Sequence, residues 1–477
     1  EETELESTPF KKVDIKNSGH DWLHCEVTKW KFIGKCSIDN LEKVIGIFKG
    51  WVEDNSIRKY FDLIPFRKGV RWGFCDRDKN IIIENKYDMV YKYEKGLAAV
   101  KINGKWGIID KNEKIIVPFK YDEIGSYHLG KFYLESYDVI LAKIGDFYGY
   151  IDTENNIRVP FKYKYLSSEV INDLNENFRG SSPLYIGDFS DYYARVVKRK
   201  QGLFSKTNYR FGFIGTWGQE IVPFDYDYAS DFRSNITLVK KNNKYGFVYG
   251  FGVKKSDAEL ITSIKYDDAG NFSGMYVQEL ARVSLITNGE KKWGYINTKG
   301  SETIPIKYDE VKDFSVFSGC VKLVNKYGFI NKYGDTIIPF EYDDAKRSSD
   351  KLACVKKEGK WGVVNTNNEI IVNFKYDMVN RYSEGCAVVK LNNKYGYIDK
   401  LGKEITLIKY DKAFDFKLLM GVVSLNGKYG IVNTEGEEII PIKYDEIIEI
   451  VDIDLILVKY NDTVGYIDSE GKEYWEE

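Results

Sequence analysis

The stretch Lys105-Trp-Gly-Ile-Ile-Asp110, with Val117-Pro-Phe-Lys-Tyr-Asp122 shortly after it, carries the pattern that decides the fold. An aromatic residue followed by glycine, the ring-glycine pair, opens the pattern, and a Tyr-Asp pair follows fifteen residues later. The ring-glycine pairs are Trp72-Gly73, Trp106-Gly107, Tyr148-Gly149, Phe211-Gly212, Tyr245-Gly246, Trp293-Gly294, Tyr327-Gly328, Trp361-Gly362, Tyr395-Gly396 and Tyr429-Gly430, with Val464-Gly465 as a worn eleventh copy.

The two markers recur with a constant period. From Trp293 to Tyr429 every step is 34 residues. The third copy has Tyr163-Lys164 in place of Tyr-Asp, and the fifth copy reaches its Tyr-Asp six residues late. The Tyr-Asp pairs begin at Tyr87, Tyr121, Tyr226, Tyr266, Tyr308, Tyr342, Tyr376, Tyr410 and Tyr444. A fixed period of this length indicates a repeat architecture.

Between the markers the sequence is typical of a β-hairpin. The first short apolar run ends in Asp or Asn, as at Asn297, whose side chain can bond to backbone N–H groups further on and start a turn. Three residues later comes Gly or Asn, as at Gly300, which tolerates the positive φ that closes such a turn. The second copy has Glu113 there, so its turn can differ. A third strand, such as Leu97–Lys101, precedes each ring-glycine pair, so each unit has three antiparallel strands.

The repeat length favours an open array over a closed ring. A propeller blade of the WD type needs about 40–45 residues, and propellers close at about 4–8 blades. We therefore expect an all-β, open, twisted or superhelical solenoid of about 10–11 three-stranded antiparallel repeats of 34 residues, with a β-propeller as the alternative. Residues 1–65 would form an N-terminal cap or small separate domain, 66–163 repeats 1–3, 164–205 an insertion or degenerate repeat, and 206–477 repeats 4–11 with a C-terminal cap.

Both markers are interpreted as structural. The ring would be a core plug between successive units, and the glycine would let a neighbouring backbone or ring lie flat on the strand. The Tyr hydroxyl and the Asp carboxylate would tie one unit to the next. The alternatives are a ladder of exposed rings that stacks on sugars and a carboxylate row that meets a cation or ligand.

The motif Lys-Trp-Gly followed by two aliphatic residues and Asp or Asn, then Ile-Pro-Phe/Ile-Lys-Tyr-Asp, resembles the WG-repeat (KWG-repeat) proteins of bacteria. Lys292–Asn297 with Ile304–Asp309 is a further good example, and the resemblance covers residues 66–477. It implies a recognition or scaffold module without a shared active site.

Composition limits the function classes. The chain has 70 Lys and Arg residues and 72 Asp and Glu residues, and this balance argues against electrostatic binding of nucleic acid over a broad surface. No apolar run is long enough to span a membrane. Only three histidines occur, the six cysteines form no C-x-x-C motif, and we predict no metal site, no cofactor and no catalytic set. Cys320 and Cys354 are expected to be free core thiols, and Cys25 could pair with Cys36.

Interruptions of the repeat are where specificity is expected. Tyr148 to Phe211 spans 63 residues, which is 29 more than one step. Insertions in repeat arrays often lie on the binding face, so the candidate binding residues of this segment are Tyr185, Asp188, Tyr192 and Tyr193. The alternative is a degenerate copy with Val196–Lys200 as its remaining strand.

Repetition without convergent polar chemistry favours a non-enzymatic scaffold that binds a protein or glycan partner along an extended face. One alternative is an enzyme with its site in the N-terminal segment or in residues 164–205, and another is a carbohydrate-binding array. The chain begins with Glu1 and no Met, which indicates a processed form. A secreted or cell-envelope location is therefore slightly favoured over a cytoplasmic one.

If the rings are core plugs, Trp361→Ala should lower the free energy of unfolding by about 3–5 kcal/mol as a large-to-small core change. Equilibrium denaturation of wild type and variant measures this difference. A loss below about 1 kcal/mol would show that the ring is exposed.

Overall fold

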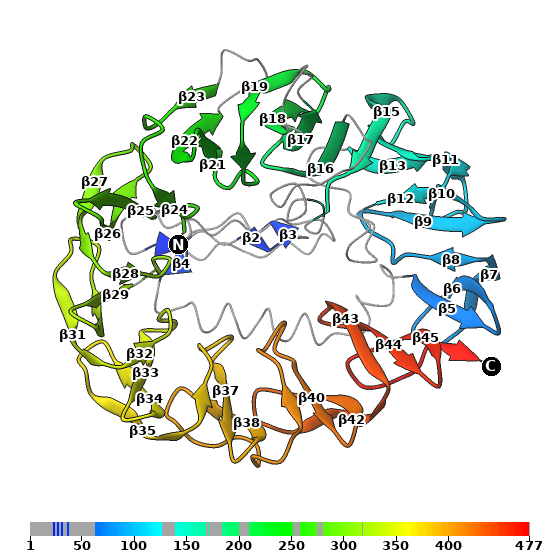
Figure 1. Ribbon diagram of the computed structural model, residues 1–477. Helices are drawn as coiled ribbons and strands as arrows, with labels where there is room; N and C mark the ends of the chain where they lie inside the picture. The colour runs from blue at the N-terminus through cyan, green and yellow to red at the C-terminus, as the bar shows by residue number, and fades with distance from the viewer. Residues whose placement is uncertain are drawn as a thin grey trace. The chain divides into compact units, whose positions relative to one another are not determined.

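The computed structural model describes residues 63–125, 139–167, 170, 184–199, 209–250, 258–273, 280–316 and 318–476, and four two-residue strands nearer the N-terminus. The chain divides into two units (Figure 1). The smaller unit is Glu1–Leu63 with Asp76–Asn80, and the larger is Ile64–Cys75 with Ile81–Glu477. In the smaller unit β1 (Trp22–Leu23) pairs with β4 (Cys36–Ser37), and β2 (Glu26–Val27) pairs with β3 (Trp30–Lys31), both antiparallel. Cys25 lies outside the described residues, so the pairing with Cys36 stays a prediction.

The larger unit is a series of small, mainly antiparallel sheets, which confirms the all-β repeat array. Each sheet carries one ring-glycine pair, except that the pairs of Tyr148 and Phe211 share one sheet. The strands that precede the pairs are β5 (Ile64–Lys68), β9 (Leu97–Ile102), β13 (Ile140–Ile144), β17 (Tyr193–Arg199), β21 (Ile236–Lys241), β25 (Leu280–Thr287), β29 (Gly319–Leu323), β33 (Leu352–Lys357), β37 (Cys386–Leu391), β40 (Gly421–Leu425) and β44 (Leu455–Tyr460). The strands that carry the pairs are β6 (Arg71–Cys75), β10 (Lys105–Asp110), β14 (Phe147–Ile151), β18 (Tyr209–Gly215), β22 (Lys244–Gly250), β26 (Glu290–Asn297), β30 (Lys326–Ile330), β34 (Lys360–Asn365), β38 (Lys394–Asp399), β41 (Lys428–Val432) and β45 (Thr463–Ile467).

The last strand of a sheet, here called the edge strand, ends at the Tyr of the Tyr-Asp pair in most copies. The edge strands are β7 (Ile81–Tyr87), β11 (Ile115–Tyr121), β15 (Ile157–Tyr165), β19 (Glu220–Tyr226), β23 (Ala258–Leu260), β27 (Glu302–Tyr308), β31 (Thr336–Tyr342), β35 (Ile370–Tyr376) and β42 (Glu438–Tyr444). In the copy of Tyr395 only isolated bridges, Tyr395 with Tyr410 and Ile398 with Glu404, hold this position.

A further short strand, not evident from the sequence, opens most sheets. It consists of the two residues after a Tyr-Asp pair and joins the following sheet, so most units have four strands instead of three. These strands are β8 (Met89–Val90), β12 (Glu123–Ile124), β20 (Tyr228–Ala229), β24 (Asp268–Ala269), β28 (Glu310–Val311), β32 (Asp344–Ala345), β36 (Met378–Val379) and β39 (Lys412–Ala413). Longer strands, β16 (Leu184–Ser190) and β43 (Glu446–Asp452), take this place in two copies. The chain therefore crosses from one sheet to the next directly after each Tyr-Asp pair.

The glycine faces an irregularity in the edge strand in most copies. Trp361 pairs with Tyr376 and Val363 pairs with Val372, so the edge strand has two extra residues in this interval. The extra backbone crosses over Gly362, where an added Cβ would lie 2.6 Å from the Val372 carbonyl oxygen. Six other copies place the carbonyl of the equivalent Ile or Val at 2.5–2.8 Å from such a Cβ. The predicted close approach over the glycine is thus confirmed.

The turns follow the predicted chemistry. The Asn297 side chain accepts backbone N–H groups of Lys299 and Ser301, each at 3.0 Å, and Gly300 has a φ of 77°. The Glu113 turn was expected to be able to differ, but it has the same form. Glu113 has a φ of 63°, and its N–H donates to the Asp110 carbonyl at 3.0 Å.

The core lies between sheets, because each sheet packs its faces on its neighbours. One cluster joins Trp361, Val363 and Val372 to Val379 and Val389 of the following sheet. The rings at the repeat position are buried in seven copies (Trp72, Trp106, Tyr148, Phe211, Trp293, Tyr327 and Trp361) and half-buried in three (Tyr245, Tyr395 and Tyr429). The prediction that they are core plugs is therefore confirmed.

The two ends of the array pair with each other. β46 (Trp475–Glu476) runs parallel to β5 and completes the first sheet, and Figure 1 shows red β45 beside blue β5. The Arg67 guanidinium donates to the Val464 carbonyl at 3.0 Å, and the Trp72 and Tyr466 rings lie edge to face at 5.9 Å. The tail was expected to cap an open rod. In the structure the tail supplies the outer strand of the first sheet, where pairing satisfies free backbone groups of β5.

Gly362→Ala should lower the free energy of unfolding by about 1–3 kcal/mol, because the added methyl group overlaps fixed backbone. Gly187 is the matched control, since an added Cβ there meets its nearest atom at 3.7 Å. Gly187→Ala should be neutral or slightly stabilising. Chemical denaturation compares the two, and equal effects would contradict the role assigned to the close approach.

Candidate binding site

The Asp of each Tyr-Asp pair clamps two sheets together. One oxygen of Asp377 accepts the Lys360 ammonium at 2.7 Å, from the strand that carries Trp361. The other accepts the Asn392 backbone N–H at 2.9 Å, from the hairpin loop of the next sheet. The same arrangement recurs at Asp122, Asp343 and Asp411. The tie predicted from the sequence is confirmed, and these carboxylates are occupied by the protein itself.

These contacts lower the pKa of the clamp carboxylates. For Asp377 the Lys360 ammonium is the main cause, and the Asn392 N–H adds to it. The pKa values of Asp122, Asp267, Asp309, Asp343, Asp411 and Asp445 are lowered in the same way, with a lysine as the leading cause each time. These seven carboxylates are therefore charged at neutral pH.

The Tyr of each pair is buried, and in several copies its hydroxyl donates to a residue at the turn before the next edge strand. The Tyr121 hydroxyl donates to Asn155 Oδ1 at 2.6 Å, and the Tyr342 hydroxyl donates to Asn368 Oδ1 at 2.6 Å. Burial raises the pKa of both Tyr121 and Tyr342 to about 12. Tyr87 donates to the Glu113 carboxylate at 2.8 Å. The Glu113 side chain thus has a partner at a position where most copies have Gly or Asn.

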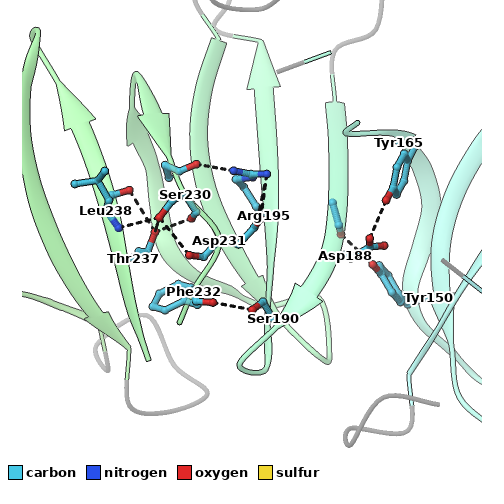
Figure 2. Close-up of polar contacts among 12 residues, drawn as sticks. Tyr150, Tyr165, Asp188, Ser190, Arg195, Ser230, Asp231, Phe232, Thr237 and Leu238 are labelled. Atoms are coloured by element: carbon cyan, nitrogen blue, oxygen red, sulfur yellow. Dashed lines mark hydrogen bonds and ion pairs between the residues drawn. The ribbon is translucent and has the colours of Figure 1, made fainter. Parts of the chain in front are cut away.

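Figure 2 shows the insertion segment that the sequence singled out. Tyr185 and Tyr193 are buried in a core cluster, where Tyr193 packs on Phe232 with ring centroids 4.3 Å apart. Asp188 is half-buried and accepts the Tyr165 hydroxyl at 2.8 Å. Tyr192 is exposed on a turn with a φ of 73°. The structure therefore brings Tyr185 and Tyr193 into the core and leaves Tyr192 on the surface.

β16 and β17 of this segment join neighbouring sheets. β15 pairs with β16 in parallel, and β17 pairs with β18, so one eight-stranded sheet runs from β12 to β19. Arg195 of β17 is buried, donates to the Ala229 carbonyl at 2.9 Å and forms an ion pair with Asp231 at 3.2 Å (Figure 2). The segment is thus fastened to the next sheet by charge as well as by backbone pairing.

The residues directly after the short opening strands link one sheet to the next. Arg282 pairs with Asp313 at 2.9 Å, repeating the Arg195–Asp231 contact. Lys346 donates to Asn380 at 2.7 Å, and Asn380 donates to Asp415 at 3.1 Å. We call the two residues that follow each short opening strand, such as Lys346 and Arg347 after β32, the loop row. The second residue after the opening strand changes in charge along the array, from Asp313 to Arg347 and Arg381 and then to Asp415.

Four cysteines among the described residues, Cys75, Cys320, Cys354 and Cys386, are buried free thiols, as expected for Cys320 and Cys354. Burial raises the pKa of Cys320 and Cys354 to about 12 and that of Cys386 to about 11. Cys320, Cys354 and Cys386 are therefore protonated at neutral pH and behave as small apolar residues.

One surface signal escaped the sequence reasoning. The first residue of the edge strand, nine positions after the ring, is an exposed isoleucine in three successive copies: Ile81 (44% exposed), Ile115 (56%) and Ile157 (61%). We call these residues the isoleucine row. Other copies have Glu220, Glu302, Thr336, Glu404, Glu438 and Glu473 at this position. Aligning the copies by their rings would have revealed the difference.

A cavity of about 470 Å³ lies where the fifth copy is extended. It combines apolar, aromatic and oppositely charged side chains, and is lined by Ser234, Ile236, Tyr249, Glu259, Leu260, Ile261, Thr298 and Lys299.

Within the described ranges, no three His, Cys, Asp or Glu side chains gather closely enough to hold a metal ion. The described part of the chain also has no helix long and apolar enough to cross a membrane.

These features define an all-β repeat protein whose units are joined by ring-glycine and Tyr-Asp pairs. The family model described as WG containing repeat matches residues 72–106, 106–132, 148–173, 211–245, 293–319, 327–361, 361–395, 395–429 and 429–463. More than half of the sequence is matched, so the chain belongs to the WG-repeat family, as the resemblance indicated. A second model, Immunity protein 53, matches residues 1–53.

No curated protein matches the chain. Solved structures that it is similar to include one described as a eukaryotic initiation factor, with 11% identity over 80% of this chain and 95% of that chain and a TM-score of 0.40. Another is the extracellular domain of the putative hybrid two component system BT4673 from B. thetaiotaomicron, with 8% identity, coverage of 86% and 76%, and a TM-score of 0.23. Likenesses this weak carry no argument about fold or function.

Acid should weaken the clamps. A carboxylate whose pKa is lower in the folded than in the unfolded chain stabilises the fold above its unfolded value, about 3.9 for Asp, and loses this effect as pH falls through the folded value. Replacing Asp343, Asp377 and Asp411 together by Asn should therefore lower the melting temperature more at pH 7 than at pH 3. Glu470→Gln, on an exposed turn, is the control and should show no such pH dependence. A melting-temperature loss of equal size at both pH values would show that the clamp charges do not matter.

Proposed function

We propose that the WG array is a non-enzymatic scaffold that binds a protein partner through the isoleucine row on its first three copies. The observation that carries the proposal is the run of exposed isoleucines at one repeat position where most other copies have charged residues. Exposed apolar side chains that gather in one place are typical of protein interfaces. Sheets that pack face to face lie about 10 Å apart, so the row would extend over at least about 20 Å.

The partner is expected to contact side chains and not to add a strand. Edge strands present free backbone groups that can pair with another chain. In β11, exposed Pro118 interrupts this edge, because proline has no N–H to donate. β15 carries exposed Pro160 and is already paired with β16. A continuous series of backbone hydrogen bonds with a partner strand is therefore disfavoured. The isoleucine side chains would make the contacts with the partner instead.

A protein partner is supported over a glycan. Stacking on sugars needs a series of exposed rings, and the rings at the repeat position are buried or half-buried. Residues 1–53 match a family described as an immunity protein. Immunity proteins and the nucleases that they pair with form some of the tightest protein–protein complexes known.

We keep the domain division as part of this proposal, with residues 1–65 as an N-terminal module, 66–163 as repeats 1–3, 164–205 as an insertion and 206–477 as the remaining repeats. The insertion residues Tyr185, Asp188, Tyr192 and Tyr193 remain a proposed contact region. Of these, exposed Tyr192 is the side chain that a partner would touch first.

The test compares Ile115→Lys/Ile157→Lys with Ile370→Lys. Ile370 occupies the same repeat position and is 56% exposed, but the adjoining copies have Thr336 and Glu404 there. The partner is captured with the full chain from the organism of origin, purified, and titrated against each variant by calorimetry. The double variant should weaken binding at least about tenfold, equivalent to about 1.4 kcal/mol, and Ile370→Lys should leave binding unchanged.

Two results would overturn the proposal. One is equal weakening by the row variant and the Ile370 control, with circular dichroism showing both to be folded. The other is turnover of a hydrolase substrate that a single carboxylate substitution abolishes, because the enzyme alternative would then hold.

A further inference from the structure

The loop row contains a group of positive side chains on two successive copies. Lys346 and Arg347 follow β32, and Asn380 and Arg381 follow β36. Arg347 and Arg381 hold the same position 34 residues apart. They are close enough for the charge of Arg381 to oppose that of Arg347, and burial lowers the pKa of the Arg347 guanidinium as the leading cause. Two like charges therefore lie near each other at equivalent positions of successive copies, with Asp313 also close to Arg347.

The nearby carboxylates are already engaged elsewhere. Asp313 pairs with Arg282 at 2.9 Å, Asp344 lies 3.4 Å from Lys312, and Asp415 accepts the Asn380 amide at 3.1 Å.

The three cations have only neutral acceptors among their recorded hydrogen bonds. Lys346 donates to the Asn380 amide at 2.7 Å, and Arg347 donates to the Phe314 carbonyl at 2.6 Å. Arg381 is exposed. Among the described residues, Lys346, Arg347 and Arg381 form no ion pair with an acid. Arg195 of β17 and Arg282 of β25, in contrast, each pair with an aspartate of the loop row.

The environment of Lys346 makes this excess charge costly. The ammonium is half-buried and lies 5.2 Å from the centroid of the Trp361 ring. Burial is the leading cause of its lowered pKa. A half-buried cation without a carboxylate partner is destabilised, and a bound anion would remove that cost. Perturbed groups clustered in this manner are a mark of functional sites.

We infer that Lys346, Arg347 and Arg381 form a subsite for carboxylates and bind an acidic segment of a protein. Two guanidinium groups on successive copies can each receive a carboxylate through paired N–H donors. The flanking Asp313 and Asp415 limit the site to a short segment, because they repel a long polyanion. Nucleic acid would need a longer stripe of cations than three side chains. The inference goes beyond the proposed function, since it concerns other copies than the isoleucine row.

The test uses the full chain and fluorescently labelled hexaglutamate, with binding followed by anisotropy in 50 mM salt. Arg381→Glu is the main variant, because an exposed side chain can be reversed in charge without disturbing the core. Lys409→Glu is the matched control, with the same charge change at an exposed site on the edge of a neighbouring copy. Arg381→Glu should weaken binding at least about tenfold, Lys409→Glu less than about twofold, and hexaglutamine should not compete.

Three results would overturn the inference. The first is no saturable binding of hexaglutamate, the second is equal weakening by the two variants, and the third is binding of inorganic triphosphate in preference to hexaglutamate. Arg347→Lys gives a second measurement, because it keeps the charge but loses the paired donors, and it should weaken binding several-fold while circular dichroism stays unchanged. None of these results bears on the isoleucine row, whose test uses other residues and the natural partner.

Discussion

The close approach of the edge strand over the glycine of each ring-glycine pair is the constraint on which the architecture depends. The ring points to one face of its strand and fills the space toward the next sheet, while the glycine lets the irregular edge strand cross on the other face. A side chain at the glycine would push the edge strand away. The Tyr at its end would then lose its place in the core, and the Asp that follows would lose its contact with the next hairpin. One missing Cβ therefore controls the spacing between sheets.

In a series of stacked sheets, the first and last sheets each have an unpaired edge. In this protein the C-terminal strand β46 pairs with β5 of the first sheet. In an open array each copy contacts only its neighbours, and terminal copies need polar caps. Here β46 supplies the strand that the first sheet lacks, and the charged ends meet in ion pairs such as Lys68–Glu476 at 3.0 Å. Through this pairing the first and last copies also contact each other. The proline at the exposed edge of several copies, such as Pro305 and Pro339, limits pairing with other chains.

Much of this architecture could be predicted because short sequence patterns, repeated in each copy, determine it. The period, the turns at Asn297 and Gly300, the burial of Trp361 and the ties of the Tyr-Asp pairs all follow from residue chemistry over a few positions. The short strand Met378–Val379 could not be predicted, since two residues carry no periodicity and owe their pairing to the strand that packs on them. The pairing of Trp475 with Arg67 depends on contacts between the distant ends of the array, and the sequence of the tail shows only charge.

The division between constant and variable positions bears on how such an array acquires function. Rings, glycines, Tyr-Asp pairs and turn residues are occupied by contacts inside the protein, so altering them to suit a ligand would weaken the stack. The first residue of the edge strand and the residues of the loop row also make internal contacts in some copies, but they change in polarity or sign from copy to copy. Ile115 and Glu302 hold one equivalent position, and Asp313 and Arg347 hold another. Because the sheets fix the spacing of these positions, a particular order of apolar and charged residues becomes a surface with defined geometry. Recognition by this protein is therefore expected to reside in the copies that depart from the repeat.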